Sequence, residues 1–217
     1  MTEELGHIEK PPVSSFTAKR KIYLVPLLYR GNEAPPEYTE KFDLYWQQVA
    51  EQIGNLETKL GNVDRIYHES VAVGGEEGLG LLEKLNPSSS QITREKCQKG
   101  AQLEATEDRE LAEECLDWER CLFMVFMSEK VAQKVSQFYL EASRKRYEHI
   151  AKRIEETLKE GETAILFIRE GHSIQFPKDI QVFSVMPPAL DQIHKWMRER
   201  SAAKERSTPG ITVAMIR

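Results

Sequence analysis

The chain alternates between short apolar runs and longer segments in which apolar residues recur every three or four positions. Four runs have the length and composition of strands, and they cover residues 22–29, 63–73, 164–168 and 180–185. The segments with helical spacing lie between and after these runs. This order predicts an α/β fold in which a mixed sheet of about four strands has flanking helices.

The longest helical pattern lies between the second and third predicted strands. Apolar side chains step by three and four from Leu111 to Val125, and again from Tyr147 to Leu158. Ser128 followed by Glu129 suits a helix start between the two halves. The pattern therefore predicts a long helical-hairpin insertion at about residues 90–160, with one bent helix as the alternative. A helix of about 30 residues would be roughly 45 Å long, so we expect part of it to project.

We expect one domain rather than two, because two strands alone make a marginal sheet. This single α/β domain covers residues 21–200. A flexible lead over residues 1–20 precedes it, and a tail over residues 201–217 follows. The lead carries Glu3 and Glu4 and has no apolar core, so it lacks the layout of a secretory signal.

Composition restricts the class of protein. The 217 residues carry a formal net charge of −5, which argues against a surface devoted to nucleic acid. No apolar run approaches the roughly 18 residues that span a bilayer, so we expect a soluble protein with no membrane partner. Cys97, Cys115 and Cys121 form an odd set without a CxxC pair, which favours reduced thiols and a cytoplasmic location.

Four polar residues that follow apolar strands are the candidate catalytic residues. His68 and Glu69 end the second strand, and Glu170 and His172 follow the third. If these strands are parallel neighbours, the four side chains meet at one edge of the sheet. They would then offer an acid–base pair, and ligands that zinc or iron accepts, with the metal itself unknown. The simpler alternatives are polar strand residues facing water and a β-turn at Gly171.

The glycine-rich segment from Gly74 to Gly78 does not indicate a cofactor site. It lacks the GxGxxG spacing, and it lacks the lysine and hydroxyl of a phosphate-binding loop. The carboxylates of Glu76 and Glu77 would repel a phosphate at this helix start. The sequence therefore assigns no cofactor-binding residue and leaves any cofactor unknown.

Charge is segregated along the helical section. Acidic residues crowd its first half, at Glu104, Glu107, Asp108, Glu110, Glu113, Glu114, Asp117 and Glu119. A basic face follows, at Arg144, Lys145, Arg146, Lys152 and Arg153. This basic face suits either pairing with the acidic helix, as flanking charges do in helix pairs, or contact with RNA or DNA phosphates.

The apolar run from Cys121 to Met127 is the candidate interface. If it is helical, Met124, Phe126 and Met127 belong to a segment that is apolar around its whole circumference. Such a segment has to be buried in the core or against another chain. Methionine and phenylalanine adapt to imperfect surfaces, so a homodimer contact is a reasonable use.

These features favour three functions in order. The first is an association or regulatory module that acts through its long helices, as a homo-oligomer or with a protein partner. The second is a small hydrolase-like or ligand-binding enzyme with the His/Glu site at the strand ends. The third and weakest is an RNA-associated module that uses the basic face.

Overall fold

The computed structural model of the protein describes residues 19–31 and 33–207. The strands are β1 (Arg20–Pro26), β2 (Arg65–His68), β3 (Gln102–Leu103), β4 (Thr163–Ile168) and β5 (Ile180–Ser184). The helices are α1 (Pro36–Leu60), α2 (Gly75–Leu85), α3 (Pro87–Gln98), α4 (Arg109–Leu122), α5 (Glu129–Thr157) and α6 (Pro188–Ser207). The expected lead and tail lie mostly outside the described residues, although residues 201–207 continue α6.

The described strands form one sheet in the order β3-β2-β4-β1-β5, and every neighbouring pair is parallel. The predicted α/β class with flanking helices is confirmed. The sheet has five strands where about four are expected, and its described strands are all parallel rather than mixed. The additional strand, β3, has only two residues, which is too short for an apolar alternation to reveal.

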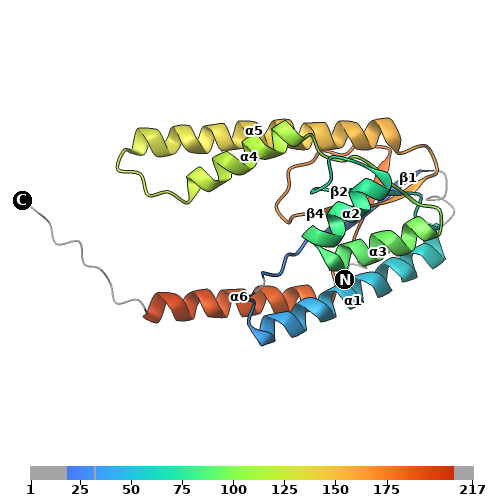
Figure 1. Ribbon diagram of the computed structural model, residues 1–217, viewed down its shortest axis with the longest axis horizontal. Coiled ribbons are helices and arrows are strands. Elements are labelled where there is room, and N and C mark those ends of the chain that lie inside the picture. Colours follow the sequence, from blue (N-terminus) through green and yellow to red (C-terminus); the bar gives the residue numbers. More distant parts are fainter. Residues whose placement is uncertain (1–18, 32, 208–217) are drawn as a thin grey trace, which may run out of the picture.

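The sheet is covered on both faces, which explains why β4 is apolar along nearly its whole length. Ile165 and Phe167 pack on one face with residues of α1, α2, α3 and α6. Ala164, Leu166 and Ile168 pack on the other face with residues of α5. Figure 1 shows the layers, with α5 above the sheet and α1 and α3 below it.

The expected helical hairpin is present and consists of α4 and α5, joined by residues 123–128. Asp108 caps α4 by accepting a hydrogen bond of 3.0 Å from the backbone N–H of Leu111. The hairpin starts later than the expected insertion, because residues 87–103 form α3 and β3 and pack in the sheet domain. In Figure 1 the connecting loop lies at the left-hand end, beyond the sheet.

The two halves of α5 have different surroundings. Its C-terminal half packs on the sheet through Tyr147, Ile150 and Ile154, whereas its N-terminal half lies beside α4. We call residues 109–145 the hairpin arm and residues 123–127 its tip. Although α5 has 29 residues, neither it nor any other described helix has the length and apolar composition needed to cross a membrane.

Candidate functional site

A pocket of about 400 Å³ lies where the carboxyl ends of three neighbouring strands meet the hairpin. Tyr29 follows β1, Glu69 follows β2 and Arg169 follows β4, and all three residues line the pocket. The crevice outside the carboxyl ends of parallel strands is where α/β folds bind ligands. This carboxyl-edge pocket is therefore the candidate functional site of the sheet domain.

The carboxyl-edge pocket has apolar walls and a charged floor. The walls are Tyr29, Ala72, Leu85, Ala112 and Leu116. The floor is Glu69, Glu107, Arg146 and Arg169, and three further polar residues, Ser70, Arg109 and Glu113, complete the lining. Pockets that bind ligands commonly combine a mostly apolar lining with a few converging polar groups.

The floor is a buried cluster of ion pairs. Arg146, on α5, donates hydrogen bonds to Oε1 of Glu107 from Nε, at 2.9 Å, and from Nη2. Oε2 of Glu69 lies 3.6 Å from Nη2 of Arg146 and 3.5 Å from Nε of Arg169. Arg169 also donates from Nη1 to Glu119 of α4, at 2.8 Å. The cluster therefore ties the hairpin to the ends of β2 and β4.

The cluster leaves hydrogen-bonding capacity unused. Within the described part of the chain, Nη1 of Arg146, Oε2 of Glu69 and Oε2 of Glu107 are buried without a hydrogen-bond partner. Burial raises the pKa of Glu107 to about 7, although the hydrogen bond from Arg146 opposes that change. Burial disfavours the charge on Arg146, but its pair with Glu107 outweighs burial and raises the pKa of Arg146. The floor thus contains one buried donor and two buried carboxylate oxygens that make no hydrogen bond, although Oε2 of Glu69 lies beside two guanidinium groups.

His68 is fully buried and does not line the pocket. Its Nδ1 accepts a hydrogen bond of 3.1 Å from the backbone N–H of Ser70, which assigns the ring proton to Nε2. Nε2 then donates to the hydroxyl of Ser89, at 3.1 Å, in the first turn of α3. Burial lowers the pKa of His68 to about 3, so the ring is neutral near pH 7. These contacts describe a structural histidine that connects β2 to α3.

Glu170 and His172 follow β4 but lie towards opposite faces of the sheet. Glu170 accepts a hydrogen bond of 2.7 Å from Nε2 of His194 on α6, whereas the His172 ring lies 6.4 Å from that of Tyr147 on α5. No hydrogen bond, ion pair or ring contact joins any two of the four candidate catalytic residues, and only Glu69 reaches the pocket. The described residues also contain no group of three or more His, Cys, Asp and Glu placed to hold a metal ion.

The five residues of the basic face do not form one surface in the fold, because one of them is buried and four are exposed or partly exposed. Arg146 points into the buried cluster and is the one member that pairs with the acidic segment, through Glu107. The other four pair with glutamates of α5 itself: Arg144 with Glu148, Lys145 with Glu141, and Lys152 and Arg153 with Glu156. These pairs neutralise much of the exposed charge, which does not favour a footprint for nucleic-acid phosphates.

The predicted interface residues lie in the tip of the hairpin arm, which is a loop and not a helix. The exposed fractions are 83% for Phe123, 96% for Val125 and 105% for Met127. Met124 is also exposed, and Phe126 is partly buried. The segment escapes burial in the core because the chain reverses direction here, beyond the sheet.

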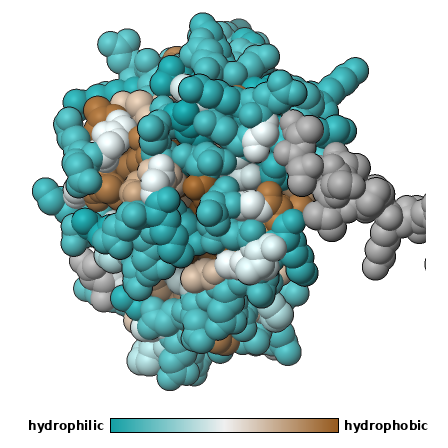
Figure 2. Space-filling model, turned by 90° about the vertical axis from the view of Figure 1, so that its right-hand side faces the viewer, coloured by the Kyte–Doolittle hydropathy of each residue, from teal (hydrophilic) through white to brown (hydrophobic). Residues whose placement is uncertain are grey.

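The tip contrasts with the opposite end of the molecule. Figure 2 shows that end, which is mostly hydrophilic, with hydrophobic residues in small separate patches. A run of neighbouring apolar side chains as exposed as those of the tip commonly marks an interaction site.

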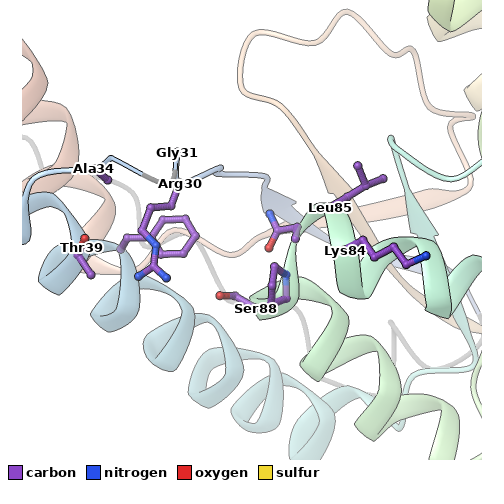
Figure 3. Close-up of a pocket in the computed structure, with 10 residues that line it drawn as sticks. Arg30, Gly31, Ala34, Thr39, Lys84, Leu85 and Ser88 are labelled. Carbon is purple, nitrogen blue, oxygen red and sulfur yellow. The ribbon is translucent and has the colours of Figure 1, made fainter.

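A second pocket, of about 450 Å³, shares Leu85 with the carboxyl-edge pocket. In Figure 3, Arg30 and Thr39 lie on one side of it and Leu85 and Ser88 on the other, while Lys84 extends away from Arg30. Arg30 pairs with Asp43 at 3.1 Å and covers the ring of Phe42. Arg30 is therefore engaged within the chain and Lys84 extends away from it, so the two cations of this pocket do not converge on one point.

Sequence reasoning missed two members of the buried cluster, Glu107 and Arg169. Arg169 directly follows the most apolar strand, and this position was an available signal for the carboxyl edge. Glu107 gave no comparable signal, because it is one of many acidic residues before and within α4. Arg146 is expected only as one of five residues of a basic face, which pairs with the acidic helix or contacts phosphates, and only the fold shows that Arg146 is the buried member.

Comparison of the chain with protein-family models, curated proteins and solved structures gave no match. Function therefore has to follow from the carboxyl-edge pocket and the hairpin arm.

Proposed function

We propose that this protein acts by self-association, in which its hairpin arm pairs with the arm of a second copy. The exposed tip carries the proposal, because Phe123, Val125 and Met127 are almost entirely in contact with solvent. Burying a large apolar side chain contributes roughly 1.5–3 kcal/mol. A surface that covers the tip would therefore gain several such contributions.

The sparse packing of the arm supports the same proposal. Only Cys115 is buried among the 14 residues of α4. Further along the arm, Leu116, Phe138 and Leu140 expose apolar surface. Helices in proteins gain most of their stability from packing an apolar face. Two hairpins packed together would form a four-helix bundle and supply that packing.

The charges of the arm favour a second copy of this chain as the partner. Five carboxylates and two arginines lie on α4, whereas four cations and two carboxylates lie on residues 129–145 of α5. If two arms pair antiparallel about a two-fold axis, the acidic helix of each lies beside the basic helix of the other. A two-fold interface makes this favourable contact twice.

The positions of the charges select the antiparallel arrangement. Glu110 and Glu114 lie at the base of the arm, and Lys130 and Lys134 lie near its tip; none of the four forms an ion pair within the described residues. The two glutamates lie in the first half of α4, which is about 21 Å long at 1.5 Å per residue, and the two lysines lie in the first two turns of α5, just after the tip. Antiparallel arms bring these acidic and basic groups together, whereas arms paired tip to tip would place lysines beside lysines.

Charge reversal tests this arrangement. One variant carries Glu110→Lys and Glu114→Lys, and the other carries Lys130→Glu and Lys134→Glu. Each alone should dimerise at least about tenfold more weakly, because like charges then face each other twice. A mixture should form the heterodimer, because every facing pair becomes opposite in sign. Native mass spectrometry of the mixture measures this, and homodimers that form as readily as the heterodimer would contradict the arrangement.

The tip is tested by replacing its exposed side chains. The triple variant Phe123→Ser, Val125→Ser and Met127→Ser should weaken association about 100-fold or more, since it removes roughly 3 kcal/mol or more of apolar burial. Its stability as a monomer should change little, because these side chains are exposed. Met186→Ser is the matched control, since Met186 is an exposed apolar residue outside the arm. Sedimentation equilibrium measures both, and equal effects would contradict a role for the tip.

A further inference from the structure

In antiparallel arms, the tip of one copy lies at the base of the other, and the base holds the carboxyl-edge pocket. The pocket takes Ala112 and Leu116 from the first turns of α4. A two-fold axis near Asp117, midway along the arm, would bring the tip of the partner beside Arg109, at the mouth of the pocket. The antiparallel arrangement that pairs the charges therefore also places the tip of one copy beside the carboxyl-edge pocket of the other.

We infer that the carboxyl-edge pocket is the binding site for the hairpin tip of a second copy, an inference that rests on the proposed self-association. The walls suit apolar side chains, since Tyr29, Leu85 and Leu116 are each partly exposed. The volume of about 400 Å³ lies within the range of pockets that bury drug-sized ligands, so it admits more than one side chain of the tip. Phenylalanine and methionine supply that apolar surface.

The backbone of the tip matches the floor of the pocket. Because the tip is a loop, the N–H groups of Val125, Phe126 and Met127 make no hydrogen bond within the described residues. Three residues of the floor carry buried atoms without a hydrogen-bond partner, namely Oε2 of Glu69, Oε2 of Glu107 and Nη1 of Arg146. Backbone N–H groups and carbonyls of the tip that reach these atoms on binding would complete their hydrogen bonds. A buried polar group without a partner is costly, so satisfying these atoms stabilises the complex.

Cysteine cross-linking between copies tests the contact. In chains carrying Cys97→Ser and Cys121→Ser, one preparation also carries Met124→Cys at the tip, and the other carries Leu85→Cys at the pocket wall. The mixture should give a disulfide-linked heterodimer on mild oxidation. Met186→Cys, exposed outside the pocket, replaces Leu85→Cys as the control and should give at least tenfold less product.

A second comparison needs no added thiol. Leu85→Ser should weaken the dimer about tenfold by removing a wall of the pocket. Leu81→Ser on the same helix is the matched control, because Leu81 is similarly exposed but does not line the pocket, and it should leave association unchanged. Equal effects of the two variants would overturn the inference.

The outcomes separate this inference from the proposed function. A wild-type dimer without tip-to-pocket cross-linking would overturn the inference and leave self-association standing. Disulfides between two Met124→Cys chains in preference to the mixed product would do the same, because they place the tips together. A wild-type protein that stays monomeric would overturn both.

Discussion

The two halves of α5 belong to one helix but differ in what they lie against. In the anchored half, Ile150 and Ile154 are fully buried against the sheet. In the arm half, Leu140 is 65% exposed, and Val135 and Ala142 are the buried residues. Both halves have amphipathic spacing, so the spacing identifies an apolar face without identifying what covers it. The anchored half is covered within the chain, whereas the arm half retains exposed apolar surface, which the proposed self-association would cover.

The largest expected effect comes from the junction of the two halves, at Arg146. Arg146→Met should lower the free energy of unfolding by about 3–5 kcal/mol, because it leaves Glu69 and Glu107 buried with less compensating charge. Arg144→Met, two residues earlier and exposed, should lower it by no more than about 0.5 kcal/mol. Urea denaturation measures both.

A double variant makes this junction experiment specific. If the cost arises from the unpaired carboxylate, adding Glu107→Gln to Arg146→Met should recover a substantial part of the lost stability. No recovery would show that Arg146 stabilises the junction through packing of its side chain rather than through its charge.

The next largest effect on the free energy of unfolding comes from truncating one apolar side chain in each half of α5. Ile150→Ala should cost about 3 kcal/mol, because it opens a cavity against the sheet. Leu140→Ala should cost less than about 0.5 kcal/mol in the monomer, because that side chain is largely in solvent. The comparison is made by urea denaturation at protein concentrations low enough to keep the chain monomeric. Similar losses at both positions would contradict the division of α5.

The smallest of these effects is a pH dependence of the junction. Because the pKa of Glu107 is raised from 4.5 to about 7, the folded chain keeps a proton that the unfolded chain releases at lower pH. The stability that Glu107 contributes by keeping this proton is fully present below about pH 4.5 and is lost as the pH rises through 7. It amounts to at most about 3 kcal/mol. The raised pKa of Glu69 acts in the same direction.

Glu107→Gln should flatten this part of the pH profile, since glutamine does not titrate. Glu113→Gln, at an exposed position of α4, serves as the control and should leave the slope in place. Thermal unfolding between pH 4.5 and 7.5 provides the measurement. An unchanged slope in Glu107→Gln would assign the dependence to other groups.

Much of the fold was predictable from the chain because its long elements carry strong periodicity. The run from Ala164 to Ile168 is apolar throughout, as a strand covered on both faces requires. The two-residue β3 carries no such signal, and its place at the sheet edge comes from pairing with β2. The parallel direction of the strands likewise depends on where the connections pass, which spacing alone does not record.

The candidate site was less predictable, because sequence position shows where a strand ends but not where a side chain then points. Glu69 and His68 are neighbours, yet Glu69 joins the floor of the pocket while His68 is enclosed between β2 and α3. Glu170 and His172 separate in the same way, towards α6 and α5. The apolar tip was recognised as a surface to be covered, but its loop conformation depends on where the hairpin turns.

The molar mass of the wild-type protein in solution tests the central claim most directly. Light scattering at micromolar concentrations should give a mass of about 50 kDa, twice the 25.0 kDa of one chain. The triple tip variant should return the mass of a single chain under the same conditions. A wild-type mass that stays at 25.0 kDa as the concentration rises through this range would contradict self-association through the hairpin arm.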